Sequence, residues 1–333
     1  MLKYHQVNPK NRWAGGLTRG LQSEFPDQMT TLVPLKDIQK FGLDGEPTGP
    51  PRRLPSWFKV KIQQGPDYRD MRRLVDKRGL HTICEEARCP NIWECWNNRT
   101  ATFLILGAIC TRRCQYCAVQ TGRPEGLDLE EPLRVADAVH MLGLRHAVIT
   151  SVNRDELPDG GASMFVETIR QIRCKVPSCT VEVLVPDFQG KVSALASVME
   201  ARPDILNHNI ETVPRLFPSI RPQGKFDRSL ELLKRAKQMG GITKSGLMAG
   251  LGETTEELRE VMRELRKVGC DILTIGQYLQ PTKNHEPVHR FYPPDEFHAL
   301  QREGFDLGFR HVESGPLVRS SYHAEQQTGK ALN

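Results

Sequence analysis

Six of the nine cysteines in this chain are crowded between residues 84 and 117. They form two triplets: Cys84, Cys89 and Cys95, then Cys110, Cys114 and Cys117. The odd total, without an apolar secretory segment ahead of it, disfavours a disulfide framework. Neither triplet has the four ligands or the Cys-x2-Cys pairs typical of zinc. Gaps of two to five residues suit soft thiolates around an iron–sulfur cluster, and three thiolates leave one iron open for a substrate or cofactor.

A strand–helix alternation begins near residue 101. Short apolar runs predict strands at 102–106, 147–151, 180–185, 205–208, 242–247 and 272–276. Amphipathic stretches predict helices near 67–79, 132–143, 162–173, 190–201, 225–239, 254–268 and 294–307, whereas 84–96 reads as irregular. Thr254 and Glu257 form a candidate capping box. Six strands each followed by a helix indicate a parallel α/β fold, either an open doubly wound sheet or an incomplete (β/α) barrel.

Polar residues follow several of the predicted strands. In a barrel of this kind the chemistry lies at the carboxyl ends of the strands, and the second cysteine triplet directly follows the first strand. Further polar residues expected at this edge are Asn153, Asp155, Asp187, Asn209, Glu211 and Gln277. The sequence therefore predicts that one edge of the sheet holds both the cysteine loop and a set of polar side chains.

Composition excludes several classes of protein. The 333 residues are 38% apolar and 26% charged, as in ordinary globular domains. No apolar run is long enough to cross a bilayer, so a membrane-spanning protein is excluded. The net charge of +6 fits an acidic protein partner or an anionic small molecule and does not require nucleic acid. The first 23 residues lack Asp and Glu, so a mitochondrial or plastid transit peptide is the alternative to a cytoplasmic location.

The pattern Cys110-x3-Cys114-x-Tyr116-Cys117 after a strand resembles the signature of the radical S-adenosylmethionine (SAM) superfamily. The resemblance implies a 4Fe–4S cluster held by these three cysteines, with SAM bound to the remaining iron. It also implies a partial (β/α)6 barrel of the TIM type.

Further segments narrow the resemblance to the lipoyl synthase family. They are CEEARCPNIWECW (84–96), TSVNRDELPDGGA (150–162), NHNIETVP (207–214) and RSSYHA (319–324), and the match runs from about 60 to 325. The resemblance implies a second, auxiliary 4Fe–4S cluster on Cys84, Cys89 and Cys95. A serine of the last segment is its fourth ligand: Ser321 is the expected one, with Ser320 as the alternative.

The implied activity is insertion of two sulfur atoms at carbons 6 and 8 of a protein-bound octanoyl-lysine, with sulfur from the auxiliary cluster. Glu211 and Arg221, and with less support Asn153 and Asp155, resemble positions that face SAM. The implied partners are octanoylated lipoyl carrier domains (2-oxoacid dehydrogenase E2 subunits and the glycine cleavage H protein), a low-potential electron donor, and an iron–sulfur carrier for cluster repair.

The same resemblance divides the chain into four parts. They are an extended arm (1–60), an auxiliary-cluster extension (61–100), the radical SAM barrel (101–280) and a C-terminal extension with the serine segment (281–333). Two other functions stay open. One is a different sulfur-inserting radical SAM enzyme, such as a biotin synthase or a methylthiotransferase acting on tRNA; the other is an iron–sulfur carrier or scaffold.

Overall fold

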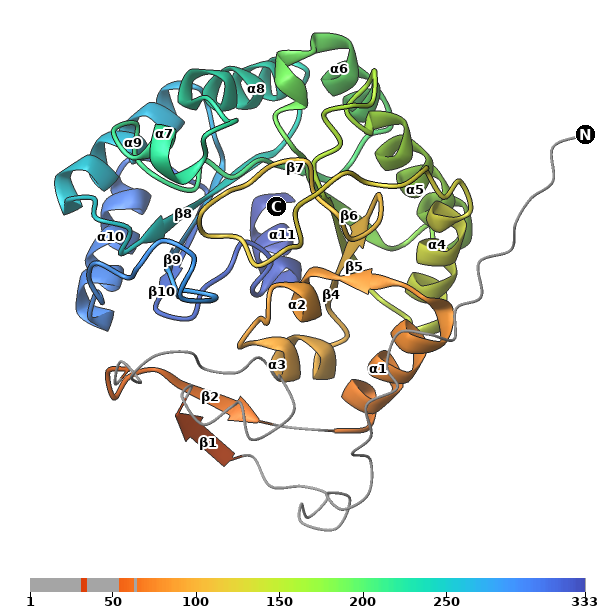
Figure 1. Cartoon of the computed structure of the whole chain (residues 1–333), viewed down its shortest axis with the longest axis horizontal. Helices are drawn as coiled ribbons and strands as arrows, with labels where there is room; N and C mark the ends of the chain where they lie inside the picture. The colour runs from red at the N-terminus through yellow and green to blue at the C-terminus, as the bar shows by residue number, and fades with distance from the viewer. Residues whose placement is uncertain (1–30, 35–53, 63–64, 333) are drawn as a thin grey trace, which may run out of the picture.

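The computed structural model of the chain describes residues 31–34, 54–62 and 65–332. Its centre is a curved eight-stranded sheet with the order β10-β9-β8-β7-β6-β5-β4-β3 (Figure 1). The strands are β3 (His81–Thr82), β4 (Ala101–Ile105), β5 (His146–Ser151), β6 (Thr180–Leu184), β7 (Ile205–Asn207), β8 (Thr243–Ala249), β9 (Ile272–Gln277) and β10 (His311–Gly315). Strands β4 to β10 pair in parallel, and β3 pairs antiparallel with β4. Within the described residues β3 and β10 are not paired with each other, so the barrel is partial.

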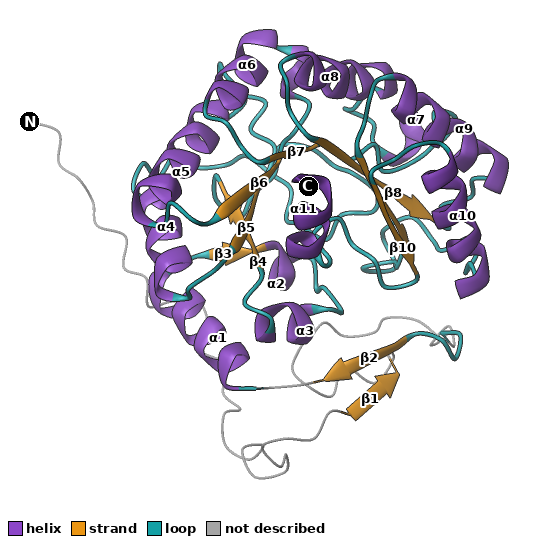
Figure 2. Ribbon diagram, turned by 180° about the vertical axis from the view of Figure 1, so that it is seen from behind, coloured by secondary structure: helices purple, strands orange, loops and turns teal. Residues whose placement is uncertain are grey.

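The main helices after β4 to β9 lie on the outer side of the curved sheet in both views (Figures 1 and 2). They are α4 (Glu131–Met141), α5 (Ala162–Lys175), α6 (Val192–Glu200), α8 (Phe226–Gln238), α9 (Thr255–Lys267) and α10 (Pro294–Asp306). Because all six of these connecting helices lie on the same side of the sheet, the doubly wound alternative is excluded. The six predicted strand–helix units and the partial barrel are confirmed, and so is the capping box of Thr254 and Glu257.

Several elements were not predicted. The segment 84–96, expected to be irregular, contains the short helices α2 (Ile83–Glu86) and α3 (Ile92–Asn97). Strands β3 and β10 and the helices α7 (Phe217–Ile220) and α11 (Ala324–Leu332) were also missed. These elements are short, and β10 carries His311, Glu313 and Ser314, so it lacks the apolar run of a buried parallel strand. Its pairing with β9 places a strand of the predicted C-terminal extension in the barrel sheet.

The N-terminal part is described only in pieces. β1 (Thr31–Pro34) pairs antiparallel with β2 (Lys59–Ile62), both within the predicted arm or at its border. Residues 1–30 and 35–53 of that arm, including the candidate transit peptide, lie outside the described residues. The predicted helix at 67–79 is α1 (Pro66–Arg78), which ends at Gly79 in the left-handed conformation (φ 58°). In the described part of the chain, no helix combines the length and apolar character needed to cross a bilayer.

Residues 316–323, which we call the C-terminal strap, run from β10 back toward the middle of the barrel. A Cβ atom at Gly276 of β9 would collide with the carbonyl oxygen of Val318, so glycine lets the strap pass close to the strand. Asn91 Nδ2 donates to the carbonyl oxygen of Leu317 at 2.7 Å. The strap leads into α11, which lies inside the ring of strands in both views and contacts β5 and β10 (Figures 1 and 2). The strap thus brings the C-terminal extension to the first cysteine triplet.

Candidate active site

Strand β4 delivers Cys110 to the carboxyl edge of the sheet. The N–H of Cys110 donates to the carbonyl oxygen of Gln120 at 2.8 Å, and the carbonyl oxygen of Cys110 accepts from Gly122 N–H at 3.0 Å. These two hydrogen bonds join the two ends of the cysteine loop. Cys110 Sγ accepts backbone hydrogen bonds from Arg112 at 3.4 Å and from Asn153 at 3.3 Å. The backbone of two strand–helix loops therefore holds the sulfur of Cys110 in place at this edge.

Cys114 and Cys117 are fixed by contacts from distant loops. His285 Nε2 lies 2.9 Å from the carbonyl oxygen of Cys117, and Gln115 N–H donates to Ile220 O at 2.9 Å. Burial raises the pKa of Cys117 to about 12 and also raises the pKa of Cys114, which the charge of Arg221 partly offsets. Protonated thiols do not bind metal, and a bound cation reverses this shift. The environment therefore suits thiols that are charged only when they hold a metal group.

Glu211 and Arg221 lie beside this loop, where their charges influence the pKa of Cys114. Asn209 Nδ2 donates to Glu211 Oε1 at 3.2 Å, and Arg221 Nη1 donates to the carbonyl oxygens of Asn209 and Ile210 at 2.8 and 3.3 Å. Burial raises the pKa of the Glu211 carboxyl, and Arg221 opposes that shift. Glu211 also has a left-handed backbone (φ 75°), a strained conformation for a residue with a side chain.

Several buried polar atoms at this edge have no hydrogen-bond partner within the described residues. Among them are Asn153 Oδ1, Asn209 Oδ1 and Arg221 Nε. Buried polar atoms without a partner carry a cost that a bound polar molecule removes. The amino, carboxylate and ribose groups of SAM offer donors and acceptors for both oxygens and for the guanidinium. The residues at this edge therefore fit SAM.

Asp155 makes a different contact from the one the sequence suggested. Both of its carboxylate oxygens accept hydrogen bonds from the buried Arg112, at 2.6 and 2.8 Å, and Arg112 also binds Asp187 at 2.5 Å. Although burial opposes it, the hydrogen bond from Arg112 lowers the pKa of Asp187. Asp155 therefore fixes the cysteine loop through Arg112, and any contact of Asp155 with SAM has to share its carboxylate with this ion pair.

The first triplet is carried by the short helices that the sequence did not predict. Cys84 lies in α2 and Cys95 in α3, and Cys89 N–H donates to Cys84 O at 2.9 Å in the connection. Thr82 caps α2 by accepting from Glu85 N–H at 3.3 Å. Burial, followed by the neighbouring thiols, raises the pKa of Cys84 to about 12 and the pKa of Cys95 well above its usual range. The three thiols thus lie close enough to influence one another, with Cys84 buried and Cys89 and Cys95 half-buried.

The C-terminal strap lies against this triplet. The charge of Arg319 lowers the pKa of Cys89, although burial is the larger influence and raises it. Tyr322 Oη donates to Glu94 Oε2 at 3.1 Å, directly beside Cys95 in the chain. Ser321 lies between these two contacts, as does Ser320, and both are half-buried. The predicted serine segment and the predicted auxiliary cysteines are therefore brought together, while the identity of the serine ligand stays a prediction.

The described residues contain no group of three or more His, Cys, Asp or Glu side chains that converges on one point, as the ligands of a single metal ion would. A 4Fe–4S cluster makes a different demand, because each thiolate binds its own iron and the sulfur atoms stay spread around the cube. Two groups of three neighbouring thiols therefore fit the donor set of a cluster better than that of a lone ion.

Sequence reasoning missed the residues that support the site from a distance. His285 and Glu94 have no motif of their own, and their partners Cys117 and Tyr322 are far away in the chain. Arg112 is another such residue: it is buried and forms ion pairs with two aspartates. A signal for Arg112 was present, because Asp155 and Asp187 both follow strands that meet at the same edge.

Two family models match the chain. The model of the radical SAM superfamily matches residues 104–265, and that of the N-terminal domain of lipoyl synthase matches residues 43–89. Among curated proteins, the lipoyl synthase of Rubrobacter xylanophilus is 63% identical over 279 residues, which cover 83% of this chain and 87% of the relative. The lipoyl synthase of Chloroflexus aggregans is 55% identical over 305 residues, 91% of this chain and 99% of the relative.

Solved structures show the same fold at low sequence identity. The FeFe-hydrogenase maturase of Carboxydothermus hydrogenoformans is similar with a TM-score of 0.51 and 15% identity, over 78% of this chain and 77% of its own. Methylornithine synthase is similar with a TM-score of 0.50 and 17% identity, over 72% and 73% of the two chains. At these identities the likeness supports the partial barrel alone.

Proposed function

The chain belongs to the lipoyl synthase family of radical SAM enzymes, and from this we propose that it inserts two sulfur atoms into an octanoyl group carried by a lysine of a lipoyl carrier domain. The positions are carbons 6 and 8. Their C–H bonds are far too weakly acidic for a side-chain base, so the reaction needs a radical. When bound, SAM on a 4Fe–4S cluster supplies a 5′-deoxyadenosyl radical, and an auxiliary cluster supplies the sulfur.

At the carboxyl edge we assign Cys110, Cys114 and Cys117 to the SAM cluster. Glu211 and Arg221 would hold SAM, together with Asn153. The unpaired Asn153 Oδ1 and Arg221 Nε support this assignment. Asp155 positions the cysteine loop through its ion pair with Arg112. We propose that its carboxylate also contacts SAM.

At the first cysteine triplet and the C-terminal strap we assign Cys84, Cys89, Cys95 and Ser321 to the auxiliary cluster. A serine oxygen is a harder ligand than a thiolate, so it binds the iron of a sulfide cluster less tightly. That difference suits a cluster whose sulfur is consumed. The place of the strap against Cys89 and Cys95 supports Ser321.

The observation that carries the proposal is that cysteines of both triplets share one hydrophobic core. Cys84 and Cys110 are members of the same hydrophobic cluster, and Cys89, Cys95 and Cys117 pack against it. Apolar side chains packed around both cluster sites can exclude water and hold a hydrocarbon chain so that its position decides which carbon reacts.

We further propose the partners and the compartment. The substrates are octanoylated domains of 2-oxoacid dehydrogenase E2 subunits or the glycine cleavage H protein; a low-potential electron donor and an iron–sulfur carrier complete the cycle. Six cysteines that must stay reduced require a reducing compartment, for which we propose the cytoplasm. A mitochondrial or plastid matrix meets the same requirement.

The test is anaerobic reconstitution followed by SAM, dithionite and an octanoylated lysyl peptide. Full loading should give about eight irons per chain, and about four in Cys114→Ala and in Cys95→Ala. Mass spectrometry should show 5′-deoxyadenosine and a peptide with two added sulfur atoms. Cys114→Ala should abolish both products, whereas Cys95→Ala should keep only the nucleoside. Deoxyadenosine without sulfur insertion in the wild type would indicate a different radical SAM activity, and neither product would favour a carrier.

A further inference from the structure

Glu94 connects the two halves of the auxiliary site. It lies in α3, immediately before Cys95. Its Oε2 accepts the hydroxyl hydrogen bond of Tyr322 at 3.1 Å, and its Oε1 lies 3.2 Å from His323 Nε2. One carboxylate therefore joins the cysteine helix to the strap residues that follow Ser321.

The strap is restrained at both ends of its serine pair. Before the serines, Asn91 Nδ2 binds the carbonyl oxygen of Leu317. After them, the rings of Tyr322 and His323 stack with centroids 3.8 Å apart, and His323 Nδ1 lies 3.7 Å from Glu313 Oε1 on β10. His323 has a left-handed backbone (φ 54°), a conformation that its contacts have to maintain. Loss of the Glu94 contacts would therefore release the strap beside Ser321.

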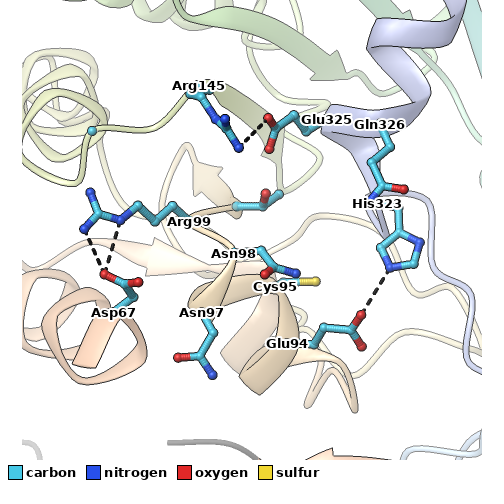
Figure 3. Close-up of a pocket in the computed structure, with 12 residues that line it drawn as sticks. Asp67, Glu94, Cys95, Asn97, Asn98, Arg99, Arg145, His323, Glu325 and Gln326 are labelled. Atoms are coloured by element: carbon cyan, nitrogen blue, oxygen red, sulfur yellow. Dashed lines mark hydrogen bonds and ion pairs between the residues drawn. The ribbon is translucent and has the colours of Figure 1, made fainter. Parts of the chain in front are cut away.

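A polar cavity of about 560 Å³ lies directly behind this contact (Figure 3). Cys95, Glu94 and His323 line one side of it, and the Arg145–Glu325 ion pair lines another (Figure 3). Its wall includes Thr100 and Arg145, which directly precede β4 and β5. The cavity is therefore at the amino ends of these strands, whereas Cys110 follows the carboxyl end of β4.

We propose that Glu94 is a positioning residue for the serine ligand: it latches the strap over the cysteine triplet, and the cavity behind it is the path for hydrated iron ions when the latch opens. The inference rests on the auxiliary-cluster site of the proposed function. The cavity lining includes the carboxylates of Asp67, Glu94 and Glu325. Oxygen donors of this kind suit a hydrated iron ion, a harder species than the iron held by sulfide. Iron would then pass without crossing the SAM end of the barrel.

The test uses the reconstituted holoenzyme and a ferrous-iron chelator. Glu94→Ala should release the auxiliary iron roughly tenfold faster than the wild type, as loss of one charge-assisted hydrogen bond would allow. Glu94→Gln should give an intermediate rate, because its amide oxygen still accepts from Tyr322. The control is Glu86→Ala, which removes another Glu–His pair, with His81 at 3.3 Å, from the same cysteine segment without touching the strap. Its release rate should match the wild type.

A rescue separates positioning of the serine from a general loss of structure. In the Glu94→Ala background, Ser321→Cys should slow iron release again, since a thiolate holds iron without help from the latch. Asn98→Trp, at an exposed residue lining the cavity, should slow release in Glu94→Ala by narrowing the path.

Three results would overturn the inference. They are an unchanged release rate in Glu94→Ala, equal acceleration by Glu86→Ala, and no rescue by cysteine. An unchanged rate after Asn98→Trp would remove the cavity as the path. Iron in the wild-type protein is counted first: only about four irons per chain would refute the auxiliary cluster itself, and with it the proposed function.

Discussion

Lys244 on β8 and Glu182 on β6 form an ion pair with an N–O distance of 3.0 Å, and both side chains are fully shielded from solvent (0% exposed). The strand between them contributes Asn207, whose Nδ2 donates to Glu182 Oε1 at 2.8 Å. Burial alone would raise the pKa of Glu182, but Lys244 and the hydrogen bonds lower it to about 2. The barrel therefore contains a buried ion pair in which the charge of each residue is stabilised by the charge of the other.

Removing one charge of the Lys244–Glu182 pair should destabilise the fold much more than removing both charges. Lys244→Met leaves a buried carboxylate without its cation and should lower the free energy of unfolding by about 3–5 kcal/mol. The double variant Lys244→Met/Glu182→Gln should recover most of this loss. Urea unfolding of the apo-protein measures both, with Lys267→Met, from an exposed pair with Glu264, as the control expected to change little. A loss below about 1 kcal/mol in Lys244→Met would contradict the buried-pair account.

His208 should make stability depend on pH. Burial, assisted by the charge of Arg221, lowers its pKa to about 4. In the unfolded chain the pKa is about 6.5, so between these values the unfolded state binds more protons and stability rises with pH, by about 3 kcal/mol in all. His208→Gln should flatten this slope, and His140→Gln, at an exposed residue of α4, should keep it. The test is to measure the free energy of unfolding of both variants from pH 4 to 7. Equal slopes against pH in His208→Gln and His140→Gln would contradict the role of His208.

Ser321 and Ser320 can be separated by their effect on the two products. Ser321→Ala should keep formation of 5′-deoxyadenosine and impair formation of the two-sulfur peptide, because only the auxiliary cluster loses a ligand. Ser320→Ala should resemble the wild type. Mass spectrometry of both products in one reaction makes the comparison, and the opposite pattern would assign the ligand to Ser320.

Arg221 should matter for SAM binding through the shape of its guanidinium. Its Nη1 is used by two backbone carbonyls and its Nε is unpaired, and a lysine cannot reproduce both groups. Arg221→Lys should weaken SAM binding about tenfold, the size of one charge-assisted hydrogen bond. Arg215→Lys is the control, since this exposed arginine binds Glu257 instead. Equilibrium dialysis of the reconstituted variants measures both, and equal SAM affinity in the two would remove Arg221 from the site.

The parts of the fold that could be predicted are those with local patterns. The capping box of α9 lies within four residues, and β4 is an unbroken buried run. Strand β10 could not be predicted, because its burial comes from β9 and α10 and its own residues are mixed. The cysteine ligands were accessible from their spacing. Contacts such as Glu94 with Tyr322, 228 positions apart, depend on the finished fold and leave no pattern in a single sequence.

The route of the strap past Gly276 has a consequence for biosynthesis. A nascent chain that has left the ribosome up to residue 315 contains both cysteine triplets and all the strands of the barrel sheet, yet it lacks the serines. Any cluster inserted at that moment would meet only three protein ligands. On the proposed assignment of Ser321, translation order thus makes the oxygen ligand the last component of the auxiliary site to be synthesised.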